Sequence, residues 1–220
     1  GADRIELCSE LGVGGITPSA GLIQLVKREL TIPVHVLIRP RGGHFTYSDS
    51  EFEVMKSDIL ACKALGVDGI VSGVLTEDFS VDVARTRTLV ELANPMHFTF
   101  HRAFDWVLEP LEAINQLEEL GVQTILTSGG ATAADKGIKN LGAWQQKTSM
   151  TLMAGGGVSP QNAANFKDIG LKAIHCSGTS FGNQLDLSGK ISMNSSKHLA
   201  EDQVAISNLD ILSAIVRAVK

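Results

Sequence analysis

One short pattern is repeated three times in the chain: the end of a helix, a glycine, a short turn and the start of a buried strand. It reads Leu-Gly-Val-Asp-Gly-Ile from residue 65, Leu-Gly-Val-Gln-Thr-Ile from 120 and Ile-Gly-Leu-Lys-Ala-Ile from 169. The first glycine of each copy (Gly66, Gly121 and Gly170) can adopt the positive φ that ends a helix. Its recurrence after roughly two helix–strand units predicts an α/β fold made of repeated βα units.

Strand-like and helix-like runs alternate along the chain, and no signal for an antiparallel hairpin separates them. This order predicts a parallel sheet covered by helices. Helices are expected between the strands and again over 202–219, after a polar stretch of loop at about 180–200. The predicted strands span residues 4–8, 33–40, 69–75, 97–101, 124–127, 151–154 and 173–176.

Seven βα units fit a TIM-type (β/α)8 barrel that lacks its first βα unit. Such barrels contain about 250 residues, and the strand expected at residue 4 begins almost without a lead-in. We therefore expect residues 1–220 to form one βα-barrel domain. A doubly wound open sheet is the alternative, but the Gly-x-Gly-x-x-Gly motif that often follows its first strand is absent.

Composition and charge argue against several classes of partner. The net charge of −5 gives no attraction to nucleic acid or to an anionic membrane, and no apolar run reaches the ~18–20 residues of a membrane span. We expect neither partner. The three cysteines, Cys8, Cys62 and Cys176, are widely spaced and odd in number, so no disulfide framework is expected. They predict a reducing, intracellular compartment.

Polar residues gather at the carboxyl ends of the predicted strands, whereas the opposite ends are apolar. In a βα barrel, ligands bind at the carboxyl ends and in the loops that follow them. The asymmetry therefore predicts a functional site there. The residues at these ends are Glu6, Cys8, Arg39, Arg41, His101, Arg102, Asp105, Thr127, Ser128, Gly155, Gly156, Gly157, His175, Cys176 and Ser177.

One part of this site is predicted to bind an anion. Three consecutive glycines offer bare backbone N–H groups, and a helix is expected to begin just after them at Ser159. Three arginines at the same rim would add positive charge; a tight turn without a ligand is the alternative reading of the glycines. The predicted binding residues are Arg39, Arg41, Arg102, Ser128, Gly155, Gly156, Gly157 and Ser177.

The other part combines carboxylate, imidazole and thiol groups, which allow two kinds of chemistry. Glu6, His101, Asp105 and His175 could act as general acids and bases. Cys8, His101 and His175 could instead bind Cu(I). Strand alternation places Cys8 on the inner face with Glu6 and Cys176 on the outer face, while Cys62 is expected in the core. Cys8 is therefore the expected thiolate ligand.

As a set, seven motifs resemble the copper homeostasis protein CutC family. They occur in order from the first residues to about Gly178, and the tail after Thr179 matches weakly apart from its final helix. The motifs are Arg-Ile-Glu-Leu-Cys (4–8), Gly-Gly-Ile-Thr-Pro-Ser (14–19), Ile-Arg-Pro-Arg-Gly-Gly (38–43), Thr-Phe-His-Arg-Ala-Phe-Asp (99–105), Leu-Thr-Ser-Gly (126–129), Gly-Gly-Gly (155–157) and His-Cys-Ser (175–177).

The resemblance implies a TIM-type barrel, a homo-oligomer (dimer or tetramer), a cytoplasmic location that in animals extends to the nucleus, and binding of Cu(I). It implies no established enzyme activity. Family members begin with a further strand, which in vertebrates carries a cysteine, and this sequence does not contain that strand. The sequence also has His44 where the family usually has Asp, Ala154 where it has Pro, and Gly178 where it has Ala.

Two functions remain open at this point. The resemblance favours an intracellular copper homeostasis protein that binds Cu(I). The residues themselves favour a barrel enzyme that acts on a small phosphorylated or carboxylated metabolite at the carboxyl-terminal face, because copper does not need three arginines. Whether the chain is an enzyme is therefore left undecided by its sequence.

Overall fold

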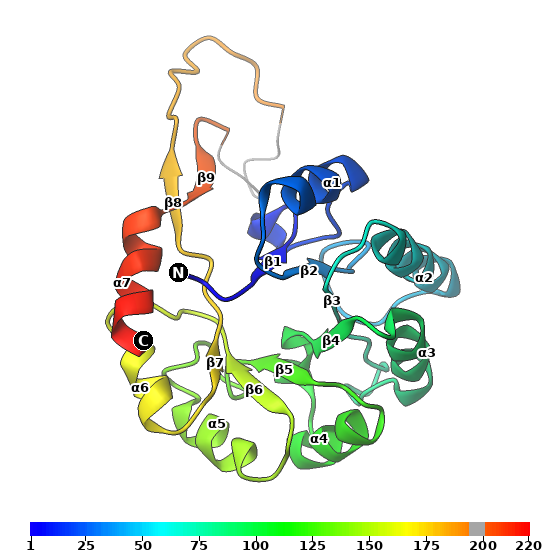
Figure 1. The fold of residues 1–220 in the computed structure, drawn as a ribbon. Helices are drawn as coiled ribbons and strands as arrows, with labels where there is room; N and C mark the ends of the chain where they lie inside the picture. The colour runs from blue at the N-terminus through cyan, green and yellow to red at the C-terminus, as the bar shows by residue number, and fades with distance from the viewer. Residues whose placement is uncertain (194–200) are drawn as a thin grey trace.

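The computed structural model describes residues 1–193 and 201–220. Its centre is one sheet of seven strands in which each strand pairs in parallel with the next strand in sequence. The sheet curls into a ring (Figure 1), which confirms the predicted TIM-type α/β architecture. The strands are β1 (Ile5–Leu7), β2 (Val34–Leu37), β3 (Gly69–Ser72), β4 (His97–Phe100), β5 (Thr124–Thr127), β6 (Thr151–Ala154) and β7 (Ala173–Ile174).

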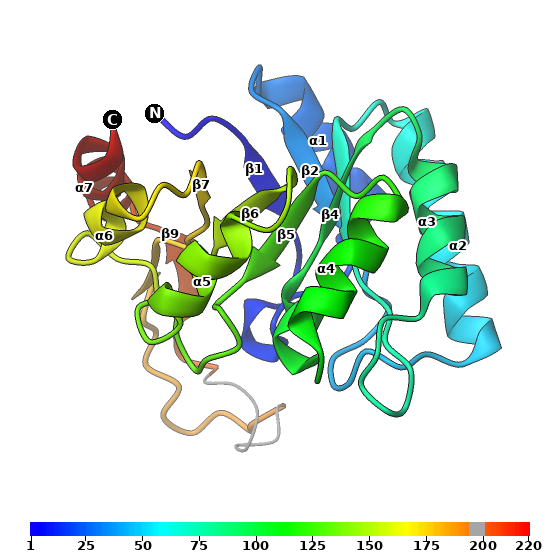
Figure 2. The same ribbon diagram turned by 90° about the horizontal axis from the view of Figure 1, so that it is seen from below.

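Helices follow the strands and surround the ring on its outer side (Figures 1 and 2). Ser48 and Glu51 form the capping box that starts the second helix, because each side chain accepts a hydrogen bond from the backbone N–H of the other residue. These helices are α1 (Ala20–Glu29), α2 (Asp49–Ala64), α3 (Val83–Ala93), α4 (Pro110–Glu119), α5 (Ile138–Gln145) and α6 (Ala163–Asp168), with short 3-10 helices η1 (Leu11–Val13) and η2 (Arg102–Trp106).

The hydrophobic core lies between the outer face of the sheet and the helices. Alternate strand residues point outward into it, and their apolar side chains lose contact with water. Fully buried examples are Val34 and Val36 on β2 and Phe98 and Phe100 on β4. The residues between them face the inside of the ring, so His35 and Thr99 are enclosed there instead.

The ring has an open side between β1 and β7, which share no strand pairing in the described part of the chain. Side chains reach across this side. Glu6 Oε2 lies 3.7 Å from His175 Nδ1, and Arg4 Nη2 donates a hydrogen bond to Met153 Sδ over 3.2 Å. The first and last strands are therefore related through side chains instead of a backbone ladder.

The chain after β7 differs from the sequence prediction. A two-stranded antiparallel hairpin, β8 (Thr179–Gly182) and β9 (Val204–Ser207), forms where a loop over 180–200 and the start of a helix at 202 were expected. The helix α7 (Leu209–Val219) begins later because the Asn208 side chain accepts hydrogen bonds from the first-turn N–H groups. Part of the expected loop, residues 194–200, lies outside the described residues.

Helix α7 lies beside α6 and the first residues of the chain (Figure 1). Leu212 occupies the space that a side chain at Gly178 would need, 2.5 Å from an ideal Cβ. Lys220 Nζ donates hydrogen bonds to the Gly1 carbonyl over 2.7 Å and to the Asp3 carboxylate over 2.6 Å. The residue that follows the final helix is therefore hydrogen-bonded to the N-terminal segment that leads into β1.

Candidate functional site

The carboxyl ends of the parallel strands and the loops after them form one rim of the barrel, and this rim carries the predicted site residues. Arg39 follows β2 and is buried. Its guanidinium donates to the carbonyls of Val13, Gly15 and Gly43 over 2.7–2.8 Å and lies over the Phe45 ring. Arg39 therefore joins the loop after β1 to the loop after β2.

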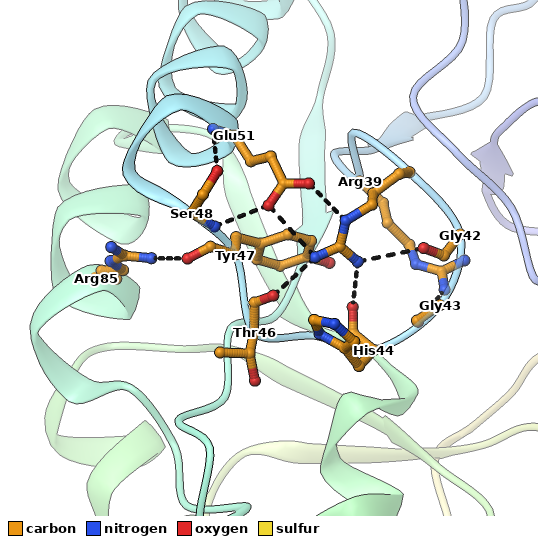
Figure 3. Close-up of polar contacts among 10 residues, drawn as sticks. Arg39, Gly42, Gly43, His44, Thr46, Tyr47, Ser48, Glu51 and Arg85 are labelled. Carbon is orange, nitrogen blue, oxygen red and sulfur yellow. Dashed lines mark hydrogen bonds and ion pairs between the residues drawn. The ribbon is translucent and has the colours of Figure 1, made fainter.

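Arg41 is engaged in a similar way. Its guanidinium contacts both Glu51 carboxylate oxygens, at 2.5 and 3.3 Å, and donates to the carbonyls of Gly42, His44 and Thr46. Figure 3 shows how Glu51 and the loop residues Gly42, His44 and Thr46 lie in this part of the rim. Sequence reasoning missed these acceptors because any residue type can supply a carbonyl. An anion contact of Arg39 or Arg41 stays a prediction and would require these bonds to be exchanged.

Arg102 is the arginine that meets the glycine turn. Its Nε donates to Asp105 Oδ2 over 2.7 Å and its Nη2 to Ser128 Oγ over 3.1 Å. An ideal Cβ at Gly156 would lie 3.0 Å from the guanidinium carbon, so the arginine rests directly on this glycine. The side chain is 43% exposed, and within residues 1–193 and 201–220 its Nη1 has no hydrogen-bond partner.

Asp105 holds this part of the rim together. Its carboxylate is only 6% exposed and accepts hydrogen bonds from Thr127 Oγ1 at 2.5 Å, from the Ser128 N–H at 2.9 Å and from the Gly130 N–H at 3.2 Å. With Arg102 as a fourth donor, the carboxylate is fully used. The geometry thus gives Asp105 a positioning role, and its predicted role as a general acid or base is left as a prediction.

The glycine turn itself is shaped by positive backbone φ angles and by the neighbouring loop. Gly156 and Gly157 have φ of 97° and 75°, values that residues other than glycine rarely adopt. Gly155 N–H extends the sheet ladder to the Thr127 carbonyl, and the Gly156 carbonyl accepts from the Ala134 N–H. The N–H groups of Gly156 and Gly157 have no partner in the described structure. Ser177 is exposed.

His101 is 5% exposed and has a defined tautomer. Its Nδ1 accepts the Ala103 N–H over 3.2 Å, so the proton of the neutral ring is on Nε2. Burial, with a smaller contribution from the Arg39 charge, lowers the His101 pKa to about 3. Nε2 has no partner among the described residues. His101 is thus a neutral hydrogen-bond donor at neutral pH.

Two residues that sequence reasoning did not select shape the surroundings of His101. An ideal Cβ at Gly73 would lie 2.6 Å from His101 Nδ1, so only glycine leaves room for the ring. The Phe45 ring packs against the imidazole with centroids 4.9 Å apart. A glycine inside the predicted strand 69–75 was the one available signal for Gly73, because such glycines often mark a close approach.

The thiol group of the site is Cys8, which is half-buried beside Gly15. Burial and then the negative charge of Glu6 raise the Cys8 pKa to about 11. Cys62 is buried, as expected for a core residue, and burial raises the pKa of both Cys62 and Cys176. Within the described ranges, no three His, Cys, Asp or Glu side chains are grouped as a metal site.

Comparison with known proteins shows relatives along most of the chain. The profile of the CutC family matches residues 1–180. A CutC family protein of Vibrio vulnificus (strain CMCP6) is 48% identical over 82% of this chain and 74% of its own length. The human copper homeostasis protein cutC homolog is 47% identical over 82% of this chain and 67% of its own length.

Comparison with solved structures also finds a CutC protein. A CutC protein of Streptococcus agalactiae superposes with a TM-score of 0.76 at 35% identity, covering 79% of this chain and 87% of its own. The 2-keto 3-deoxygluconate aldolase of Picrophilus torridus has a TM-score of 0.50 at 10% identity over 71% of this chain and 53% of its own, a likeness of fold alone. No helix in residues 1–193 or 201–220 is both long and apolar enough to cross a membrane.

Proposed function

The chain belongs to the CutC family, and on that premise we propose that it acts in copper homeostasis by binding Cu(I) through the Cys8 thiolate. Family membership supports the copper role, and the observation that carries the ligand assignment is the position of Cys8 beside Glu6. Thiolate is the soft ligand that Cu(I) prefers. Cys8 combines partial exposure with a neighbouring carboxylate.

The charge of Glu6 acts in opposite directions on the free thiol and on the metal complex. It disfavours a bare thiolate, which is why it contributes to the raised pKa of Cys8. A monovalent cation next to the thiolate would be attracted by the same carboxylate. Cu(I) would therefore replace the thiol proton, and binding would release one proton per ion.

His175 is the better placed of the two predicted imidazole ligands. Its Nδ1 lies 3.7 Å from Glu6 Oε2, so it shares the surroundings of the Cys8 side chain through Glu6. His101 has its Nδ1 occupied by the Ala103 N–H and its proton on Nε2, which leaves no free lone pair in this tautomer. A two-coordinate site of Cys8 and His175, with Glu6 as a neighbouring charge, is the proposed arrangement.

The test is a competition titration with Cu(I) against a chelator, on wild type and on single Cys→Ser variants. Cys8→Ser should weaken Cu(I) binding by about tenfold or more, whereas Cys62→Ser and Cys176→Ser should leave it unchanged. His175→Ala should weaken binding less than Cys8→Ser. Unchanged affinity in Cys8→Ser, or loss in Cys176→Ser alone, would contradict the proposal.

A second candidate function, an enzyme or binding protein for a small phosphorylated or carboxylated metabolite, is favoured by Arg102. Its unpartnered Nη1 and the free N–H groups of Gly156 and Gly157 lie at one point of the rim. Arginine and backbone N–H groups are typical ligands of phosphate and carboxylate. His101 would then supply a neutral donor nearby, of the kind that polarises a carbonyl.

Anion-dependent stabilisation tests this second function. Phosphate at millimolar concentration should raise the melting temperature of wild type, and Arg102→Ala should remove the effect. Arg28→Ala is the matched control, because Arg28 is an exposed arginine on α1 whose partner is the adjacent Glu29. Stabilisation that survives in Arg102→Ala would remove the support for an anion at this rim.

A further inference from the structure

The inside of the barrel is polar near the amino-terminal ends of the strands, which the function proposed above does not explain. Barrel interiors are usually filled by branched aliphatic side chains. Here Arg4 precedes β1 and His35 lies on β2. His97 is the first residue of β4, and Thr124 is the first residue of β5. Buried polar groups cost free energy unless they have partners, so their partners show whether the cluster is complete.

Arg4 has few partners for a half-buried guanidinium. Its Nη2 donates to Met153 Sδ on β6, across the open side of the ring, over 3.2 Å, and a thioether is a weak acceptor. No carboxylate in the described residues lies within ion-pair distance of Arg4. Glu6, two residues later, contributes a charge at longer range. The other N–H donors of Arg4 therefore have no acceptor among the described residues.

The two imidazoles lie side by side inside the ring. His35 is 5% exposed and makes no hydrogen bond with the described residues. Its ring lies where a Cβ at Gly69 would be, 2.6 Å away, and its centroid is 5.0 Å from that of His97. His97 Nε2 is 2.9 Å from Thr124 Oγ1. The absence of a side chain at Gly69 on β3 thus leaves room for the His35 ring to pack against the His97 ring.

Both imidazoles are neutral at pH 7, so each carries one N–H donor. Burial, then the charge of Arg4 and then His97 lower the His35 pKa to about 4, against a smaller opposing effect of Asp68. Burial and then Arg4 also lower the pKa of His97. This part of the interior thus contains a guanidinium with donors that no described residue accepts and a His35 ring without a hydrogen-bond partner, whereas His97 Nε2 is paired with Thr124.

We propose that Arg4, His35 and His97 bind a small carboxylate anion inside the barrel. A planar carboxylate accepts two parallel hydrogen bonds from a guanidinium and further bonds from the imidazole N–H groups. Glu6 on the same strand favours a singly charged ligand over a doubly charged phosphate. Two imidazoles and the Met153 thioether would otherwise suit Cu(I), but the positive charge of Arg4 opposes a cation.

The experiment is an acetate titration followed by the ¹⁵N resonances of the imidazoles, with chloride at matched ionic strength as reference. Acetate should move the resonances of His35 and His97, which are assigned with His35→Gln and His97→Gln. The exposed His44 should not move and serves as an internal control. Arg4→Gln should weaken acetate binding about tenfold or more, because a charge-assisted pair is lost.

Controls separate this site from the one at the rim. Arg102→Ala should leave the acetate response of His35 and His97 unchanged, whatever it does to phosphate binding. If Arg4→Gln fails to fold, Arg4→Lys keeps the charge without the planar fork and should still weaken binding measurably. The proposal is overturned if acetate leaves both imidazoles unmoved, if Arg4→Gln responds like wild type, or if Arg102→Ala abolishes the response.

Discussion

Glu6 on β1 and His175 just after β7 face each other across the open side of the barrel, with Oε2 and Nδ1 3.7 Å apart. The contact places a carboxylate beside Cys8, the half-buried thiol two residues further along the chain, just after β1. Glu6 therefore influences two residues. It can pair with a protonated His175, and it raises the pKa of the Cys8 thiol. The first prediction concerns this influence.

Removing the charge of Glu6 should make Cys8 easier to ionise. In a background with Cys62→Ala and Cys176→Ala, iodoacetamide alkylation of wild-type Cys8 should have a pH midpoint near 11. Glu6→Gln should lower that midpoint, because burial then acts alone. Alkylation by mass spectrometry at a series of pH values measures both midpoints. A wild-type midpoint at the ordinary value of 9.0 would contradict the prediction.

His35 should make the fold sensitive to acid. Its pKa is lowered to about 4 in the folded protein from 6.5, so below pH 6.5 the unfolded chain binds the extra proton and stability falls. The loss between pH 7 and pH 5 is about 2 kcal/mol for this residue. Urea unfolding at both pH values measures it. His35→Gln should show a smaller difference than wild type, whereas His44→Gln should keep the wild-type difference.

Asp105 should be needed for stability more than for proton transfer. Asp105→Asn places an N–H group among the donors that now bind the carboxylate, namely Arg102, Thr127 and the Ser128 N–H. The unfolding free energy should fall by about 2–4 kcal/mol. Denaturant unfolding tests this, with Asp168→Asn on α6 as the control expected to change little. An Asp105→Asn variant as stable as wild type would leave Asp105 free for a catalytic role.

Two glycines should respond to alanine in opposite ways. Gly73→Ala puts a methyl group 2.6 Å from His101 Nδ1, and this overpacking should lower the unfolding free energy by about 1–3 kcal/mol. Gly142 lies within α5, where a Cβ makes ordinary contacts with Ile169 at 3.7 Å. Gly142→Ala should raise stability by about 0.5–1 kcal/mol. Thermal or denaturant unfolding of both variants checks the contrast.

The sequence predicts the βα order well, since the strand pattern and the three turn glycines are local signals. Gly66, Gly121 and Gly170 all have positive φ in the structure, as expected for these turns. Boundaries are less predictable where packing decides them. Helix α5 begins only at residue 138, because Gly137 packs against the Ser128 carbonyl, where no Cβ would fit.

The candidate site could be located from sequence, but the roles of its residues could not. Strand parity predicts that polar groups share one rim, because parallel strands end at the same edge. The hydrogen bonds of Arg39 go to the carbonyls of Val13, Gly15 and Gly43, which any residue type would provide, so they could not be predicted. The inward cluster of Arg4, His35 and His97 was missed because it lies at the opposite strand ends, where function is rarely sought.

The hydrogen bond from Lys220 to the Gly1 carbonyl joins residues separated by 219 positions in the sequence. A short linker between residues 220 and 1 could therefore join these two positions without distorting the barrel. New ends could then be cut in the exposed turn at residues 77–80. In such a permuted chain β1 would enter the barrel from a preceding helix, like the strands after it.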